Sequence, residues 1–169
     1  DLTNFLVNWG ENTSVTTHGE LMNLTDFDNF AANIDNFTVH STRTDLTNFV
    51  SEKDLGITIP SSVLLQTTFS GKLDDLQANV LLTIPEGKVK IDGSFKQQNE
   101  LAFDANITVM DLRLGKIINN PNIGTVAFEM KATGNGNNIN DLNAELASTF
   151  SKLEFSGYDF SALQLNGKI

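Results

Sequence analysis

The chain has 169 residues and a formal net charge of −10, because 21 acidic residues outnumber 11 basic ones. This charge argues against nucleic acid and anionic lipid headgroups as binding partners, since both attract basic surfaces. The absence of Cys excludes disulfides, thiolate metal sites and Cys nucleophiles. We therefore expect a single domain, or one section of a larger repetitive array.

The sequence predicts only short helices. Residues 1–9 suggest a first helical piece. Residues 44–50 suggest a second, because Leu46, Phe49 and Val50 have helical spacing after a possible N-cap. Residues 111–118 predict a third helix, which Pro121 would prevent from continuing. No apolar run reaches the length of about 18 residues that a membrane-spanning helix needs.

From Ser61 onward, apolar and polar residues alternate with a period of two, which predicts antiparallel strands with one apolar and one wet side. The run Pro85-Glu86-Gly87 separates two such segments and predicts a hairpin over residues 71–95. A polar loop is expected at residues 97–100 and a further turn at residues 133–138, which are rich in Gly and Asn. The sequence thus predicts an all-β fold of about ten strands.

Two or three short helices are too few to cover the apolar side of such a sheet. One helix covers a strip about 10 Å wide, whereas strands are spaced about 4.8 Å apart. The apolar side must then be covered by the sheet itself, through sandwiching, barrel closure or curling, or by something other than protein.

Residues that could carry catalysis are scattered. His18 and His40 form no metal-binding motif, and Ser61 lacks the context of a nucleophile elbow. Neighbouring aspartates such as Asp74 and Asp75 fall in a predicted turn, where they commonly bond to the backbone. We expect no enzyme activity, no cofactor and no metal.

A resemblance to a known family is carried by three successive segments. These are IPSSVLLQTTFSGKLDDLQANVLLT, LRLGKIINNPNIGTVAFEMKATGNG and LNAELASTFSKLEFSGYDFSALQLNGKI. In order and spacing they resemble the TamB family of translocation and assembly modules, within the AsmA-like superfamily. The match is best over residues 57–169, whereas residues 1–56 fit less clearly, and we treat the whole of 1–169 as one segment of a TamB-like β-groove domain.

The resemblance implies a curled antiparallel sheet, a "β-taco", with a continuous hydrophobic groove and two or three short helices. It implies a periplasmic location, in a protein anchored in the inner membrane by a segment outside this chain. The implied function is non-catalytic: the groove guides phospholipid acyl chains between the inner and outer membranes. A further implied partner is an outer-membrane assembly β-barrel, reached through regions outside this chain.

The residues that we expect to line the groove share the apolar side of the predicted strands. They are Val80, Leu82, Ile84, Val89, Ile91, Phe95, Leu101, Phe103, Ile107, Val109, Val126, Phe128, Met130, Leu142, Leu146, Phe150, Leu153, Phe155, Leu163 and Leu165.

Two other functions stay open. The chain could be a protein-interaction module that assists the assembly of outer-membrane β-barrel proteins by offering its edge strands for augmentation. It could also be a sandwich or carbohydrate-binding module, although Trp and Tyr occur only once each. Alternation alone is commoner in the core of an ordinary sandwich than in a lipid groove.

Overall fold

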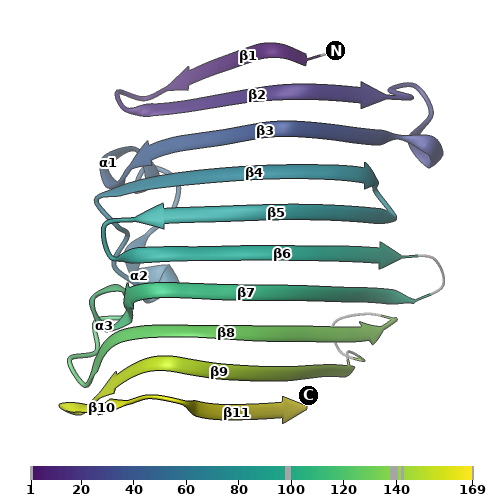
Figure 1. The fold of residues 1–169 in the computed structure, drawn as a ribbon. Coiled ribbons are helices and arrows are strands. Elements are labelled where there is room, and N and C mark those ends of the chain that lie inside the picture. The colour runs from purple at the N-terminus through teal and green to yellow at the C-terminus, as the bar shows by residue number, and fades with distance from the viewer. Residues whose placement is uncertain (1, 98–99, 138–140, 142, 169) are drawn as a thin grey trace.

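A computed structural model describes residues 2–97, 100–137, 141 and 143–168. They form one antiparallel sheet of eleven strands in which neighbours in sequence are neighbours in space (Figure 1). The strands are β1 (Leu2–Trp9), β2 (Thr13–Met22), β3 (Ala31–Thr42), β4 (Ser62–Lys72), β5 (Asp75–Ile84), β6 (Gly87–Gln97), β7 (Leu101–Arg113), β8 (Ile123–Gly136), β9 (Asn143–Phe155), β10 (Tyr158–Phe160) and β11 (Leu163–Lys168). Both β10 and β11 pair with β9, so they share the last row of the sheet.

The helices are short and lie between strands. The described residues form three α-helices, α1 (Arg43–Leu46), α2 (Glu52–Leu55) and α3 (Leu114–Ile117), and the 3₁₀ turn η1 (Phe27–Asn29). All three α-helices lie at the same end of the strands (Figure 1). Within the described part of the chain, no helix has the length and apolar character that crossing a membrane requires.

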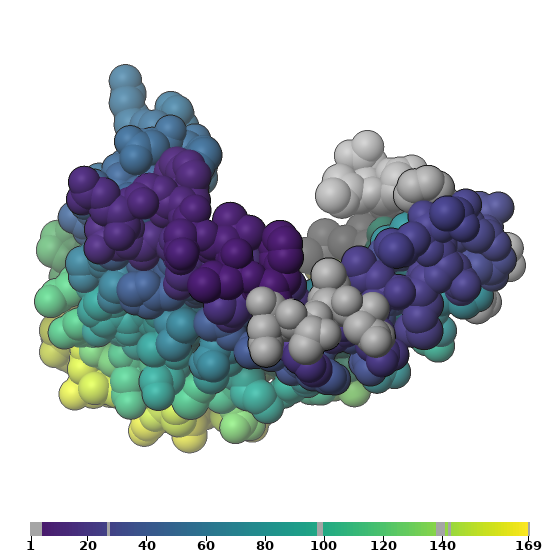
Figure 2. Space-filling model, turned by 90° about the horizontal axis from the view of Figure 1, so that it is seen from above, coloured from purple at the N-terminus to yellow at the C-terminus, as the bar shows by residue number. Residues whose placement is uncertain are grey.

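The sheet is a single open layer. The all-β fold and the short helices are as predicted, but the sheet is neither closed nor strongly curled. Figure 2, seen along the stack of strands, shows that one side of the molecule is hollowed between two raised rims. One rim carries the segment around α1 and α2, and the other carries the turn that follows β2.

The predicted hairpin over residues 71–95 is present as β5 and β6. Val80 lies opposite Ile91, and Leu82 opposite Val89. Side chains that are directly opposite in neighbouring strands point to the same face. Gln97, which was expected to open the following polar loop, is instead the last residue of β6, and residues 98–99 of that loop lie outside the described residues.

Two helix predictions were wrong in part or whole. Residues 1–9 contain strand β1, although Leu2, Phe5, Leu6 and Trp9 have helical spacing in sequence. Residues 111–113 belong to β7, and only residues 114–117 are helical, as α3. The reason is a register shift between Val109 and Leu112, which interrupts the alternation of β7.

The remaining local predictions have mixed outcomes. Of the helix predicted at 44–50, only residues 44–46 are helical, within α1, and α2 was not predicted. The expected turn at 133–138 lies mainly inside β8, which continues to Gly136, and residue 138 is outside the described residues.

The compact core is small and lies at the end of the sheet that carries α3. Its centre is formed by Ile84, Val109, Leu112 and Val126, against which Ile117 of α3 packs. The core residues of the strands and the helices lie on the same side of the sheet. Because the helical segment forms one rim in Figure 2, this is the hollowed side.

Candidate lipid-binding face

One side of the sheet is almost entirely apolar, and we call it the apolar face. Its membership follows from the register, because direct cross-strand partners share a face and neighbours along a strand alternate. Three rows of partners run across the sheet. They are Val15–Val39–Leu65–Leu82–Val89–Val109–Phe128–Phe150–Leu163, Thr17–Phe37–Thr67–Val80–Ile91–Ile107–Met130–Ser148–Leu165, and Gly19–Ile34–Phe69–Ala78–Gly93–Ala105–Ala132–Leu146–Gly167.

The opposite side, the outer face, holds the charged strand residues. Its ion pairs include Lys90–Asp92 at 2.7 Å and Lys131–Asp104 at 3.5 Å. The three rows of the apolar face contain no Asp, Glu, Lys, Arg or His among these described residues. The charged residues of these strands therefore point away from the hollowed side.

The structure brings the predicted lining residues together on the apolar face, apart from Leu142, which lies outside the described residues. Ile84, Val109 and Val126 are buried beneath the helical end, so they form core rather than open wall. Phe155 and Leu165 are about half exposed, at 48% and 51%. The other described members are partly buried and still reach solvent.

A furrow of small residues crosses the middle of the apolar face. Ala78, Gly93, Ala105 and Ala132 are direct partners on β5 to β8. Three strand spacings separate the first from the last, a length of about 14 Å. Larger side chains flank the furrow on both sides, such as Ile91 in the row toward the helices.

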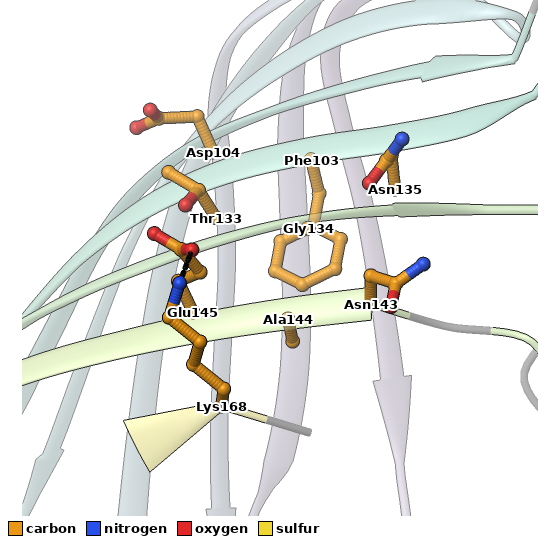
Figure 3. A pocket seen from close by; sticks show the side chains of 9 residues that line it. All are labelled: Phe103, Asp104, Thr133, Gly134, Asn135, Asn143, Ala144, Glu145 and Lys168. Carbon is orange, nitrogen blue, oxygen red and sulfur yellow. Dashed lines mark hydrogen bonds and ion pairs between the residues drawn. The ribbon is translucent and has the colours of Figure 1, made fainter. Parts of the chain in front are cut away.

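A glycine opposite Phe103 shapes the far side of this furrow. Gly134 is the direct partner of Phe103, and a Cβ atom built on it would lie 2.5 Å from the phenyl Cε1. In Figure 3 the ring lies across the strand at Gly134 and extends toward Ala144. The small residues let the ring lie along the sheet instead of standing up from it.

The rim at the helical end is formed by the segment between β3 and β4, residues 43–61. Asp45 is 3% exposed and accepts hydrogen bonds from the Asn12 amide at 2.9 Å and the Thr13 hydroxyl at 2.8 Å. The Asn12 amide, followed by the Thr13 hydroxyl, lowers the pKa of the Asp45 carboxyl below its ordinary value. This carboxylate joins α1 to the turn between β1 and β2.

The same segment also makes hydrogen bonds to α3 and to the residues that follow it. The Thr58 amide donates to the Ile117 carbonyl at 2.7 Å, and the Thr58 hydroxyl donates to Asn119 Oδ1 at 2.8 Å. After α1, the ring of Phe49 packs against that of Trp9 in β1, with 4.0 Å between the ring centroids. The segment therefore spans the strand ends from β1 to α3, and leaves the rest of the apolar face uncovered.

Sequence reasoning missed the contribution of the first three strands. Val15, Val39 and Phe37 continue the apolar rows beyond β4. Thr residues such as Thr17 occupy positions on the same face, so the apolar alternation is weak. A register shift between Ile34 and Phe37 then reverses its phase within β3. The available signal was the spacing of Val15, two residues from Thr13 and Thr17, and of Val39, two residues from Phe37, since β-branched and aromatic residues favour strands.

A separate small hollow of about 540 Å³ lies where β8 ends and β9 begins (Figure 3). Its outer-face lining includes Asp104, Glu145 and Lys168, and the last two form an ion pair. No described group of three or more His, Asp or Glu residues could hold a metal ion. Its carboxylates are neutralised by neighbouring ammonium groups, and the hollow presents no nucleophile with an adjacent base.

Among the described residues, the large pKa shift of a carboxyl is that of Glu154, which lies away from this hollow. Glu154 accepts a hydrogen bond from Lys152 at 2.7 Å and another from the Thr125 amide at 2.6 Å. Lys152, then Thr125, lower the Glu154 pKa from 4.5 to about 2. This ion pair lies on the outer face, because Lys152 and Glu154 flank Leu153, which packs against the core on the apolar face.

Comparisons of the chain with models of protein families, with curated proteins and with solved structures find no match.

Proposed function

We propose that this protein binds phospholipid acyl chains on its apolar face and guides them between the inner and outer membranes of a Gram-negative envelope, without catalysing a reaction. The observation that carries the proposal is an apolar face that crosses the whole sheet and is covered by helices at one end only. The groove is shallower than the curled one implied by the resemblance to TamB. The bound lipid itself shields the apolar face from water.

The hydrophobic effect provides enough free energy for such binding. Burial of a methylene group contributes about 0.8 kcal/mol, so fourteen methylenes fully removed from water would contribute about 11 kcal/mol. A chain that lies on an open face is shielded on one side, which leaves about half of this value before entropy is lost. Binding on this scale is strong enough to hold a lipid and weak enough to release it.

The uncharged character of the apolar face favours movement over capture. A lipid anchored through its headgroup would need a charged or hydrogen-bonding side chain beside the chain-binding surface. The central rows instead offer Val80, Ile91, Ile107 and Met130 in succession. An acyl chain that moves along them exchanges one apolar contact for a similar one. Meanwhile its headgroup stays in the water above the apolar face.

The periplasmic location and the transport route rest on the resemblance of residues 57–169 to the TamB family. The strands of residues 1–56, β1 to β3, belong to the same sheet as the rest, because β3 pairs with β4 over ten residue pairs. The less clearly matched part of the sequence therefore belongs to the same proposed surface.

A pair of lysine substitutions on β6 tests the proposal. Ile91→Lys places a charge in the middle of the apolar face, whereas Ser94→Lys places the same charge on the outer face of the same strand. Ile91 lies outside the compact core, so the fold is expected to persist. We expect the purified protein and the Ser94→Lys variant to carry phospholipid that mass spectrometry detects after extraction. The Ile91→Lys variant should carry at least tenfold less phospholipid.

Two results would reject the proposal. One is purified protein that contains no phospholipid and acquires none from vesicles of phosphatidylethanolamine and phosphatidylglycerol. The other is an equal loss of lipid in both lysine variants, which would mean that binding does not depend on the apolar face.

A further inference from the structure

Both rims of the hollowed side carry apolar side chains that are open to solvent. We call residues 43–61 the helical rim, and residues 23–30, between β2 and β3, the turn rim. In the helical rim Phe49 and Leu55 are 68% and 49% exposed, and in the turn rim Leu24 is 61% exposed. Both rims rise on the same side of the sheet (Figure 2). The exposed side chains therefore border the apolar face at both ends of the strands.

In the helical rim, polar side chains bond to the protein while apolar ones face solvent. The Glu52 carboxylate accepts a hydrogen bond from the Ile59 amide at 2.7 Å and lies 3.5 Å from the Nε atom of Arg43. Phe49 and Leu55 remain largely exposed on the same segment. Apolar side chains that gather on a surface in this way mark a site of interaction.

The turn rim is held in shape by its own hydrogen bonds. The Asp26 amide donates to the Asn23 carbonyl at 2.9 Å, and the Asn29 amide donates to the Asp26 carbonyl at 3.1 Å. Lys72 of β4 donates to Asn29 Oδ1 at 3.2 Å and ties the turn to the sheet. Because the turn is already ordered, little conformational entropy is lost when Leu24 meets a partner.

The charges of the two rims select among possible partners. The helical rim contains three acidic and two basic residues, and the turn rim contains Asp26 and Asp28 without a basic residue. Two copies that met rim to rim would bring like charges together, which disfavours a second copy as the partner. An anionic membrane surface disfavours binding for the same reason, whereas a zwitterionic one does not.

The separation of the rims favours an extended partner. They lie at opposite ends of the strands (Figure 1). Strand β5 has ten residues, so about 33 Å separates its ends. A bilayer surface is extended and deformable enough to meet both rims at once. Its interfacial region also accommodates Phe and Leu side chains, the residue types that the two rims expose.

We propose that both rims dock on a bilayer of zwitterionic phospholipid, with Phe49, Leu55 and Leu24 in its interfacial region and the apolar face turned toward the membrane. The docking itself stands on the rims. It also supplies the place at which an acyl chain leaves the bilayer for the apolar face, and this second role rests on the proposed function.

Vesicle flotation tests the docking. The vesicles contain phosphatidylcholine and phosphatidylethanolamine, and in a second set phosphatidylglycerol replaces part of this lipid. The rim variants are Leu24→Ser and the double variant Phe49→Ser, Leu55→Ser. The matched control is Leu6→Ser, because Leu6 is 57% exposed but lies on the outer face, next to the Val7–Val15 pair of the apolar face. Circular dichroism shows whether each variant keeps the fold.

We expect the unmodified chain and Leu6→Ser to float equally with the zwitterionic vesicles. Each rim variant should float about tenfold less, because it loses apolar contacts with the bilayer. Phosphatidylglycerol should reduce the flotation of the unmodified chain. Trp9 is the only Trp of the chain and contacts Phe49, so brominated phosphatidylcholine should quench its fluorescence.

Absence of flotation of the unmodified chain, or equal flotation of rim variants and control, would overturn the inference. So would a dimer in sedimentation velocity that the rim variants abolish, without any vesicle binding, since the rims would then belong to a contact between copies. Flotation of a chain that carries no phospholipid when purified and acquires none from the vesicles would support the docking and reject the proposed function. Bound phospholipid without flotation would reject the docking alone.

Discussion

Replacing two isoleucines on neighbouring strands tests whether the apolar face is uncovered. Ile84 of β5 is 9% exposed and packs in the core with Val109 and Val126, whereas Ile91 of β6 lies on the open part of the same face. The change to Ala removes three carbons, worth about 2.4 kcal/mol at about 0.8 kcal/mol each when fully buried. With the cavity that remains, Ile84→Ala should cost about 3 kcal/mol.

Ile91→Ala should cost less in lipid-free protein, about 1.5 kcal/mol, because no layer covers this side chain and its loss leaves no closed cavity. Urea unfolding followed by circular dichroism measures both values, with equal slopes required for the comparison. Equal destabilisation by the two variants would refute the reasoning, since it would mean that Ile91 is as fully covered as Ile84.

Two further predictions concern the backbone and pH. Gly19 has φ +154°, and a Cβ atom there would lie 2.3 Å from the Asn33 carbonyl oxygen, so Gly19→Ala should destabilise the fold by about 1–3 kcal/mol in urea. Gly167→Ala, with open space around it, should be close to neutral, and an equal effect of both would contradict the packing. Because Lys152 helps to lower the Glu154 pKa to about 2, this carboxylate stabilises the fold above pH 4.5, and the contribution is lost as the pH falls from 4.5 toward 2. Glu154→Gln should flatten the pH dependence of the unfolding midpoint in this window, and an unchanged profile would contradict the assignment.

The hairpin of β5 and β6 could be predicted from the sequence because local signals agree there. Leu82 and Val89 lie on one face, while Pro85 and Gly87 mark the turn between the strands. Alternation fixes which side of a strand is apolar, since a shift by one residue would reverse every side chain. This is why the predicted lining residues of β5 to β8 lie on a common face.

The strands at the N-terminal side were harder to predict because register shifts interrupt their alternation. In β1 the shift lies between Leu2 and Phe5, and in β3 it lies between Ile34 and Phe37. A shift places apolar residues at spacings of three, which also occur in helices. The error at residues 111–113 has the same cause, with Asp111 in a left-handed conformation at φ +46°.

The shape of the candidate site could be predicted only in outline. A period of two identifies an apolar side but contains no information on how far the sheet bends. The prediction of a strongly curled groove was therefore wrong. The rim formed by residues 43–61 depends on distant contacts, such as those of Asp45 with Asn12 and of Thr58 with Ile117. Contacts of this kind have no local sequence signature.

Photo-crosslinking at two adjacent positions of β7 tests the central claim most directly. A photoreactive phenylalanine analogue at Phe103 lies on the apolar face, and the same analogue at Asp104 lies on the outer face. We predict that irradiation in a Gram-negative envelope attaches phospholipid to position 103 and not to position 104. Attachment at neither position, or equally at both, would contradict the account.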